Sequence, residues 1–336
     1  MGRAALGLAC VLACAQACGD DDGGMDAGTD AGTDAPMNDG GVDAGDDAGD
    51  DGGTDAATDA PIDAPTDGGP RPRQTRFTAI LPTGESLSLP AQLDDGSPVL
   101  LTTSVAHDHA APPGEDIFAS RGSELFRATG FSETTITFGD ELPLVDSTGA
   151  SAEPSIFFSG ELSAGTPTLV GVFGSNLRVY DFDAMEFGDP AALREDDGTE
   201  FTPTSATFVN PGGGTIVLFL KEGDTQLWFL DLSDFTVDPL LQPIQCSDSS
   251  SIAPDLILGA QLPGAGDPGL AEQLVVIAGS NAHIVESIAP TICFSDGFAL
   301  VDGDGASLTP DQAFGWDFND DGNDNLILVD TVEIPE

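Results

Sequence analysis

Two stretches of this sequence nearly superimpose: residues 93–101 read LDDGSPVLL, and residues 162–170 read LSAGTPTLV. In each stretch a glycine stands four residues before a large aliphatic residue. The same spacing occurs five times, and a proline precedes each glycine by 9 to 14 residues. We therefore expect five imperfect repeats of about 50 residues. The glycines are Gly96, Gly165, Gly212, Gly266 and Gly322, and the prolines are Pro82, Pro154, Pro203, Pro254 and Pro310.

The apolar segments of these repeats are short and rich in Val, Ile, Leu and Phe. Examples are TLVGVF at 168–173, TIVLFL at 215–220 and QLVVIA at 273–278. Each is bounded by residues that favour turns, and no long helical pattern competes with them. These features predict strands throughout the domain.

A repeat near 50 residues that holds several short strands is typical of a propeller blade. The last repeat ends soon after its first strand, whereas residues 77–90 look like strands without a partner. Pairing the two ends would complete one blade and remove exposed sheet edges. We expect an all-β fold, a β-propeller of about five blades, with six possible because the first interval between glycines is long.

One loop of the last repeat carries recognisable chemistry, WDFNDDGNDNLILVD at 316–330. Its oxygen-bearing side chains alternate along the loop, and alternate residues of a curled loop can converge on one hard cation such as Ca²⁺. A polar turn that binds no metal is the alternative. The expected ligands are the side chains of Asp317, Asn319, Asp321 and Asn325 and the main-chain carbonyl of Asn323.

This loop resembles the calcium loop of FG-GAP and VCBS repeats, which form integrin-α-like propellers. The pattern of that family is roughly Asp-x-Asn/Asp-x-Asp-Gly-x-x-Asp-Leu. The resemblance implies one calcium site at residues 317–325. Asn325 stands where the family has Asp, which removes one negative charge and should weaken the site.

The charge balance limits the possible partners. The chain has 58 acidic and 9 basic residues, giving a formal net charge of −49. Such a chain repels nucleic acid and anionic lipid headgroups, whereas divalent cations are its natural counter-ions. We expect no nucleic-acid partner.

The N-terminus predicts export and lipidation. Arg3 precedes an apolar run at 4–17 that is too short for a permanent membrane span. Ala15-Gln16-Ala17-Cys18 resembles the lipobox of bacterial lipoproteins, in which cleavage leaves an acylated cysteine. Val11-Leu12-Ala13-Cys14 is a rival box, and secretion without a lipid is a further alternative. We expect residues 1–18 to be the signal peptide with its lipobox. Cys18 is expected to carry the lipid, with Cys14 as the alternative. The anchor should hold the protein at the cell envelope, on the periplasmic or surface face of the outer membrane.

Residues 19–76 are expected to form a disordered tether. This segment consists largely of Asp, Ala, Gly, Thr and Pro in near-repeats such as DAGTDAGTDAP. The self-repelling aspartates favour an extended spacer between the anchor and the domain at 77–336. A calcium-binding or glycosylated stalk is the alternative.

The remaining cysteines are Cys246 and Cys293. An exported protein meets an oxidising environment, so these two residues are expected to form a disulfide. Two buried thiols remain the alternative, because spacing alone does not place the Cα atoms within bridging distance.

Histidines and tryptophans offer weaker signals. His107 and His109 could form a metal pair, but a solvated loop is the preferred interpretation. His283 lies in an apolar run and should be structural. The many phenylalanines indicate dry packing, whereas Trp228 and Trp316 could present an aromatic surface to a glycan.

No local catalytic motif occurs in the sequence. We therefore expect a non-catalytic binding or scaffold lipoprotein with a calcium-stabilised propeller and an unknown protein or glycan as its partner. The alternative is a propeller hydrolase or lyase whose catalytic residues are dispersed among several loops. A central funnel with clustered His, Arg and carboxylates would favour the enzyme, and a channel plugged by phenylalanines would favour the binding protein.

Overall fold

Strands make up all the regular secondary structure that is described in the computed structural model. The described residues are 71–81, 84–108, 115–132, 134–163, 166–210, 215–232, 234–262, 272–287, 292–317 and 324–334. The signal peptide with Cys14 and Cys18, and residues 19–70 of the tether, lie outside them. Within the described part of the chain, no helix could cross a membrane.

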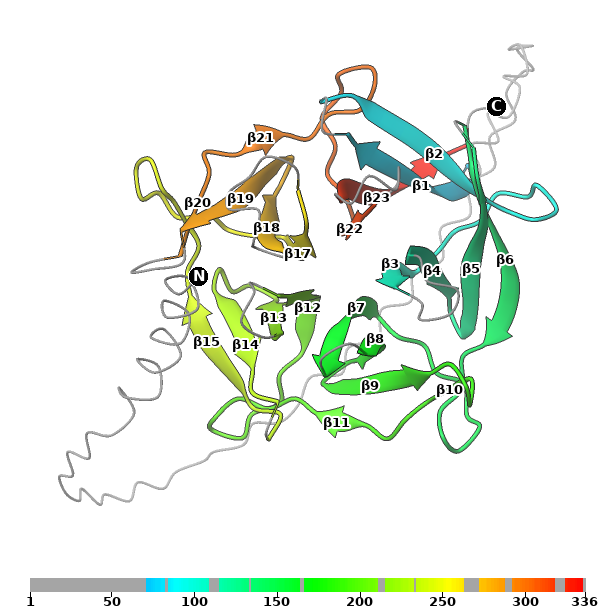
Figure 1. The fold of residues 1–336 in the computed structure, drawn as a ribbon, viewed down its shortest axis with the longest axis horizontal. Coiled ribbons are helices and arrows are strands. Elements are labelled where there is room, and N and C mark those ends of the chain that lie inside the picture. Colours follow the sequence, from blue (N-terminus) through cyan, green and yellow to red (C-terminus); the bar gives the residue numbers. More distant parts are fainter. Residues whose placement is uncertain are drawn as a thin grey trace, which may run out of the picture. The chain divides into compact units, whose positions relative to one another are not determined.

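The largest sheet has eight strands in the order β22-β23-β1-β2-β6-β5-β4-β3. It joins the first strands of the domain to the last ones (Figure 1). The strands are β1 (Arg73–Ile80), β2 (Ser86–Leu93), β3 (Thr103–Asp108), β4 (Glu115–Arg121), β5 (Glu124–Phe131), β6 (Ile136–Pro143), β22 (Gln312–Trp316) and β23 (Asn325–Glu333).

Three smaller sheets follow one another along the chain. The first contains β7 (Ile156–Ser163), β8 (Thr166–Phe173), β9 (Asn176–Asp181), β10 (Glu186–Phe187) and β11 (Ala191–Ala192). The second contains β12 (Pro203–Val209), β13 (Ile216–Lys221), β14 (Leu227–Leu230) and β15 (Val237–Leu241). The third contains β16 (Ile244–Gln245), β17 (Leu256–Ala260), β18 (Gln273–Ala278), β19 (Asn281–Ser287), β20 (Cys293–Phe294) and β21 (Phe298–Ala299).

Five strands, which we call the inner strands, surround the centre of the domain: β3, β7, β12, β17 and β22 (Figure 1). Each contacts the next in this order, and β22 contacts β3, so the ring is closed. We call each contact between consecutive inner strands a seam. Sheets arranged around a common centre make this a β-propeller-like all-β fold.

The two ends of the domain pair as the sequence predicts. Strand β1 lies between β2 and β23, in antiparallel register with both. The Arg76 guanidinium binds both carboxylate oxygens of Asp330 on β23, at 3.0 and 2.5 Å. This pairing removes the edges that β1 and β23 would otherwise expose.

Five similar acidic turns lead into the inner strands. In each, an aspartate Oδ1 accepts the main-chain N–H of the residue two positions later, which stabilises the turn locally. Each turn also contains one residue with a positive φ of 60 to 84°. The aspartates are Asp95, Asp146, Asp197, Asp248 and Asp302, and the positive-φ residues are Gly96, Gly149, Gly198, Ser249 and Gly305.

The sequence repeat assigns its first glycine, Gly96, to the wrong position of the repeat. Gly165, Gly212, Gly266 and Gly322 lie between an inner strand and the next strand of the chain, but Gly96 lies in the turn that precedes β3. The connection equivalent to the other four is 109–114, between β3 and β4. The interval from Gly96 to Gly165 is therefore long because Gly96 belongs to an acidic turn and does not correspond to the other four glycines.

The cores lie between neighbouring sheets and are rich in phenylalanine. One core joins side chains of β7–β9 to side chains of β12–β14, including Phe158, Phe208 and Phe219. Trp228 and Trp316 are only 8% and 6% exposed, so neither presents a surface to a glycan. This dry packing between sheets is what the phenylalanine content predicts.

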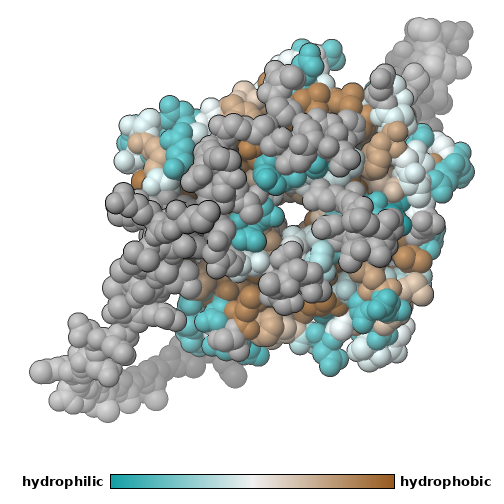
Figure 2. Space-filling model, viewed as in Figure 1, coloured by the Kyte–Doolittle hydropathy of each residue, from teal (hydrophilic) through white to brown (hydrophobic). Residues whose placement is uncertain are grey.

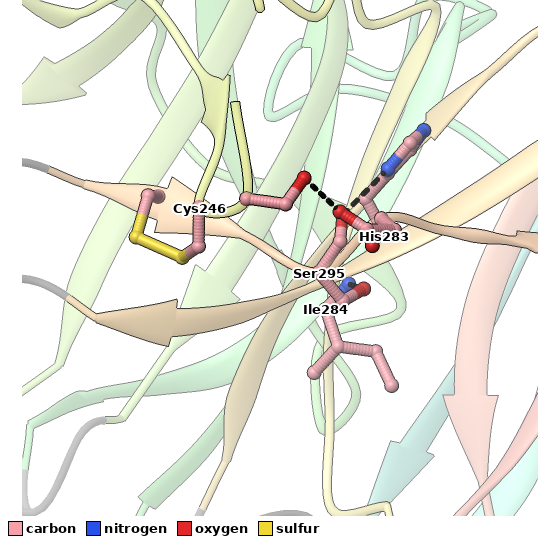
Figure 3. The surroundings of a disulfide bond; sticks show 7 residues. Cys246, His283, Ile284 and Ser295 are labelled. Carbon is pink, nitrogen blue, oxygen red and sulfur yellow. Dashed lines mark hydrogen bonds between the residues drawn. A yellow bond between two sulfur atoms is a disulfide. The ribbon is translucent and has the colours of Figure 1, made fainter. Parts of the chain in front are cut away.

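A disulfide joins Cys246 to Cys293, as expected from the sequence. The Cα atoms are 5.0 Å apart. Cys246 follows β16 and Cys293 begins β20, so the bridge lies beside the parallel pair that these two short strands form at one edge of the third small sheet. In Figure 3, Ser295 lies beside the disulfide: its hydroxyl accepts the N–H of Ile284, and its carbonyl lies 3.0 Å from His283 Nδ1. His283 is 5% exposed and structural, as predicted.

Candidate functional site

A cavity of about 300 Å³ lies at the centre of the ring, between the inner strands. The space-filling view, which has the same orientation as Figure 1, shows a narrow opening at the centre of the ring (Figure 2). Phenylalanines contribute to the lining together with small and polar residues, and no described residue that lines the cavity is Lys, Arg or His. The phenylalanines are Phe157, Phe158, Phe208 and Phe314.

Polar side chains at the ring centre cross from one inner strand to the next. At the β3–β7 seam, Thr103 Oγ1 accepts the N–H of Phe157. At the β12–β17 seam, Ser205 and Thr207 accept the N–H groups of Ile257 and Gly259. These bonds satisfy main-chain donors that face a neighbouring sheet.

The β22–β3 seam uses an amide in the same way. Gln312 Oε1 accepts the N–H of Ser104 at 2.7 Å, and Gln312 Nε2 donates to the carbonyl of Thr102 at 2.7 Å. One side chain thus satisfies the N–H of Ser104 on β3 and the carbonyl of Thr102 just before β3. It does so at the seam where the last inner strand meets the first.

Two carboxylates bind main-chain N–H groups at one end of the cavity. Glu272 Oε2 accepts the N–H of Asn210 at 2.7 Å, and Asp324 Oδ2 accepts the N–H of Gln261 at 2.6 Å. Burial raises the pKa of Asp324, and the charge of Asp317 adds to this shift, whereas the Gln261 N–H opposes it. Both acids therefore act as bridges between neighbouring sheets.

Glycines permit the closest approaches at the seams. A β-carbon on Gly160 would lie 2.4 Å from the β-carbon of Phe208, at the β7–β12 seam. A β-carbon on Gly259 would lie 2.3 Å from the carbonyl oxygen of Phe208. Real β-carbons do not approach other atoms this closely, so these seams require glycine.

His107 is not in a solvated loop, contrary to the sequence-based interpretation. It lies on β3, is 3% exposed, and its ring stacks on Phe182 at 5.1 Å between centroids. Its Nδ1 is 2.6 Å from the hydroxyl of Ser159, which lines the central cavity. His109, its proposed partner in a metal pair, lies outside the described residues. Strand β3 extends to Asp108, beyond the short apolar run that the sequence shows there, and the alternation of side chains along the strand turns His107 inward.

The predicted calcium loop is described only at its two ends. Asp317 follows β22 and Asn325 begins β23, whereas Asn319, Asp321 and Asn323 lie outside the described residues. Asn325 is 1% exposed, and its Nδ2 donates a long bond of 3.4 Å to the carbonyl of Trp316. Its Oδ1 is buried and has no hydrogen-bond partner among the residues that the structure describes. A buried amide oxygen without a donor fits a calcium ligand, because a cation would supply the missing interaction.

Within the described ranges, no group of three His, Cys, Asp or Glu side chains could hold a metal ion. The loop residues 318–323 are not part of those ranges, so the predicted ligand set as a whole stays a prediction.

Most basic side chains of the domain form ion pairs with carboxylates. Six of the eight Lys and Arg residues after residue 70 pair with a carboxylate, at 2.5 to 4.0 Å. The surface of the domain is therefore dominated by carboxylates. The pairs are Arg71–Glu333, Arg76–Asp330, Arg121–Glu124, Arg127–Asp116, Arg178–Asp146 and Lys221–Glu195.

No family model matches the chain, and no curated protein matches it. Among 103 similar chains of solved structures is one from a crystal structure of BBS1N in complex with ARL6DN, with 12% identity over 68% of this chain and 74% of that chain and a TM-score of 0.38. A luciferin-regenerating enzyme has 11% identity over 76% and 87% and a TM-score of 0.39. An auxiliary nutrient binding protein from Bacteroides thetaiotaomicron has 8% identity over 78% of each chain and a TM-score of 0.36. Similarity at this level concerns the arrangement of strands and not function.

Proposed function

We propose that this protein is a non-catalytic binding or scaffold lipoprotein of the cell envelope. Its domain would be a calcium-stabilised β-propeller of five blades, carried on an acidic tether by a lipid on Cys18. The partner would be a protein or a glycan, and the acyl anchor alone would contact the membrane. The domain would lie on the periplasmic or surface side of an outer membrane.

The observation that carries this proposal is how the polar groups of the ring centre are used. Thr103, Ser205, Thr207, Glu272 and Asp324 accept main-chain N–H groups from a neighbouring sheet, and Gln312 accepts one across the β22–β3 seam. A catalytic group must be able to exchange protons or bonds with a substrate. These side chains instead hold the ring together, which supports a scaffold whose binding surfaces lie elsewhere.

Two observations support five blades. The five inner strands form one closed cycle of contacts, and five acidic turns of the same kind lead into them. The fifth blade would consist of β22, β23, β1 and β2, which joins the two ends of the domain.

The calcium proposal rests on the loop pattern and on Asn325. Asp317, Asn319, Asp321 and Asn325 would supply side-chain oxygens, and Asn323 its carbonyl. The ion would hold the hairpin between β22 and β23 closed and offset the negative charge of Asp317 and Asp321. A resemblance to FG-GAP and VCBS repeats agrees with this role.

The lipid anchor is tested by metabolic labelling with a palmitate analogue in a bacterial host. Lipidation at Cys18 predicts that a Cys18→Ala variant loses the label and leaves the membrane fraction, whereas Cys14→Ala keeps both. Loss of the label only in Cys14→Ala would move the anchor to Cys14. Labelling of neither cysteine in the parent chain would indicate secretion without a lipid.

The binding function is tested by photo-crosslinking on intact cells that carry the full chain. We expect one partner, captured at equal yield by the parent chain and by a Ser159→Ala variant. A crosslinked product that the variant fails to form, or turnover of a substrate that the variant fails to perform, would contradict a non-catalytic role.

A hydrolase is the second candidate, and the contact between His107 and Ser159 favours it. A histidine within hydrogen-bond reach of a serine can accept its proton and activate the oxygen as a nucleophile. His107 is buried against Phe182 and Phe118, which leaves Ser159 as the group that reaches the cavity. The hydrolase predicts that a fluorophosphonate probe labels the parent protein but not Ser159→Ala, and the binding protein predicts that neither is labelled.

A further inference from the structure

A second cavity, of about 430 Å³, opens at the β7–β12 seam and is mainly apolar. Two rows of side chains face each other across it. One row is Phe158, Val170 and Val179 on β7, β8 and β9, and the other is Phe208, Val217 and Leu230 on β12, β13 and β14. We call this cavity the seam pocket.

The seam pocket continues the core between the two sheets to the surface. Five of these six residues are at most 6% exposed and belong to that core, but Val179 is 42% exposed. Leu232 and Phe235, from the turn between β14 and β15, also line the pocket and are 38% and 36% exposed. Three large apolar side chains therefore gather at the mouth of an apolar hollow, which is unusual for a surface that only faces water.

The corresponding turn of the preceding sheet carries a larger side chain at the equivalent position. The turn between β9 and β10 has Phe182 one residue after Asp181 and Met185 at φ 57°, and the turn between β14 and β15 has Leu232 one residue after Asp231 and Phe235 at φ 62°. Phe182 packs inward, on the rings of His107 and Phe118. Leu232 is smaller and 38% exposed, and the cavity beside it, of about 430 Å³, is larger than the cavity of about 350 Å³ beside Phe182.

One carboxylate lines the seam pocket, and two more lie next in sequence to residues that line it. Asp189 lines it, and the turn that supplies Leu232 and Phe235 also carries Asp231 and Asp234. Asp234 shapes this turn, because its Oδ1 accepts the N–H and the hydroxyl of Thr236. The same turn thus presents apolar and acidic side chains side by side.

The negative charges near this turn are crowded. The pKa of Asp238 is raised to about 6, first by burial and then by a hydrogen bond to Asp196 and by the charges of Asp196, Asp231 and Asp234. Two basic residues of this region already have partners: Lys221 pairs with Glu195, and Arg194 donates to the carbonyl of Gly198. A cation brought by a ligand would relieve this repulsion.

The apolar lining and the nearby carboxylates together favour one kind of ligand for the seam pocket. A second copy of this chain would bring its own acidic turns and add repulsion, whereas Lys or Arg beside an apolar anchor would complement the charge of these carboxylates. We propose that the seam pocket binds a basic peptide segment of a partner protein, with one bulky apolar side chain in the pocket and flanking Lys or Arg at Asp189, Asp231 and Asp234. This inference deepens the proposed binding function and rests on it.

The size of the pocket suits such an anchor. Ligand pockets in proteins span about 300 to 1,000 Å³, and one buried aromatic side chain commonly contributes a large share of binding energy. The acidic mouth would speed association and favour basic segments, and this attraction would weaken as salt increases.

The test uses a fluorescein-labelled peptide with one tryptophan between two pairs of lysines, titrated into the full chain and followed by anisotropy. Saturable binding is expected, and a matched peptide with alanine for tryptophan should bind about tenfold more weakly. A peptide with glutamates in place of the lysines should not bind.

A Leu232→Phe variant provides the decisive comparison, because it copies the residue that packs inward in the preceding sheet. The variant is expected to fold, to narrow the pocket and to bind the tryptophan peptide at least tenfold more weakly. A Leu100→Phe variant is the matched control, since Leu100 is 46% exposed and lies between β2 and β3, away from the pocket. It should bind as the parent chain does.

Equal binding of the tryptophan peptide by Leu232→Phe and the parent chain would overturn the inference. So would equal binding of the tryptophan and alanine peptides, which would indicate simple attraction between charges. If Leu232→Phe still captures the cellular partner at full yield, the seam pocket is not its site but the binding function stands. If the parent chain captures no partner, the binding function itself fails.

Discussion

Gly160 on β7 and Phe208 on β12 lie so close that a β-carbon on the glycine would be 2.4 Å from the β-carbon and the first ring carbon of the phenylalanine. Phe208 also lines both cavities, the one at the ring centre and the seam pocket. The spacing of this seam is therefore set by the contact between a glycine and a ring.

A Gly160→Ala substitution tests this packing. The added methyl group would push β7 away from Phe208, and overpacking of this kind costs about 1–3 kcal/mol. We expect the midpoint of urea unfolding to fall accordingly. Gly188→Ala is the control, because its β-carbon would meet its nearest atom, the Val179 carbonyl oxygen, at 3.6 Å, an ordinary contact. Equal stability of the two variants would show that the seam tolerates a wider spacing.

Calcium should stabilise the domain through the loop at 317–325. A ligand that binds only the folded state at a hundredfold excess over Kd adds about 2.7 kcal/mol. Chelation should therefore lower the melting temperature of the parent protein, and Asp317→Ala should remove the effect of calcium. Asn325→Asp should strengthen calcium binding, because it restores a negative ligand. An Asp183→Ala control should respond to calcium as the parent does; a melting temperature that ignores both calcium and Asp317→Ala would refute the site.

The acidic cluster at the turn between β14 and β15 should make stability fall as pH rises. The pKa of Asp238 is raised from 3.8 to about 6 in the folded protein. Between these values the folded state holds more protons than the unfolded state, so stability is lost as pH increases through this window and does not return above it. Asp238→Asn should add on the order of 1 kcal/mol at pH 7, after allowance for solvent screening, and nothing near pH 3.5. Asp304→Asn, which removes the same charge from an exposed turn, should not reproduce this pH dependence in thermal unfolding.

The Cys246–Cys293 disulfide should matter for stability because it closes a long loop, with a sequence separation of 47. Replacing both cysteines by serine should cost about 2–4 kcal/mol, mainly through greater freedom of the unfolded chain. Chemical denaturation of the double variant measures this cost, and dithiothreitol should lower the stability of the parent protein alone. Unchanged stability in the double variant would mean that the bridge adds nothing to the fold.

Much of the architecture follows from local sequence patterns. Short apolar runs between turn residues predicted the strands, and the unpaired strands at both ends predicted the pairing of β1 with β23. Pro154, Pro203, Pro254 and Pro310 each stand five residues after the positive-φ residue of an acidic turn. This second period was present in the sequence, and it groups Gly96 with the acidic turns and not with Gly165, Gly212, Gly266 and Gly322.

The seams could not be predicted in the same way. Thr103, Thr207 and Gln312 look like ordinary strand residues, and their role depends on which main-chain N–H lies opposite in a sheet about 50 residues away in sequence, or across the closure of the ring. The seam pocket likewise depends on a difference between two turns, Phe182 in one and Leu232 in the other. Such relationships appear only when the sheets are placed around a common centre.

Hydrogen exchange of individual amides tests most directly whether the polar groups at the ring centre hold the sheets together. The N–H groups of Phe157, Ile257, Gly259 and Gln261 each donate to a side chain from a neighbouring sheet, and the N–H of Ser104 donates to Gln312 across the β22–β3 seam. If these bonds close the ring, the five amides should be among the slowest to exchange, together with the paired amides of β1 and β23. Exchange of the five as fast as the amides of exposed turns would contradict this role and leave their side-chain partners available for chemistry in the central cavity.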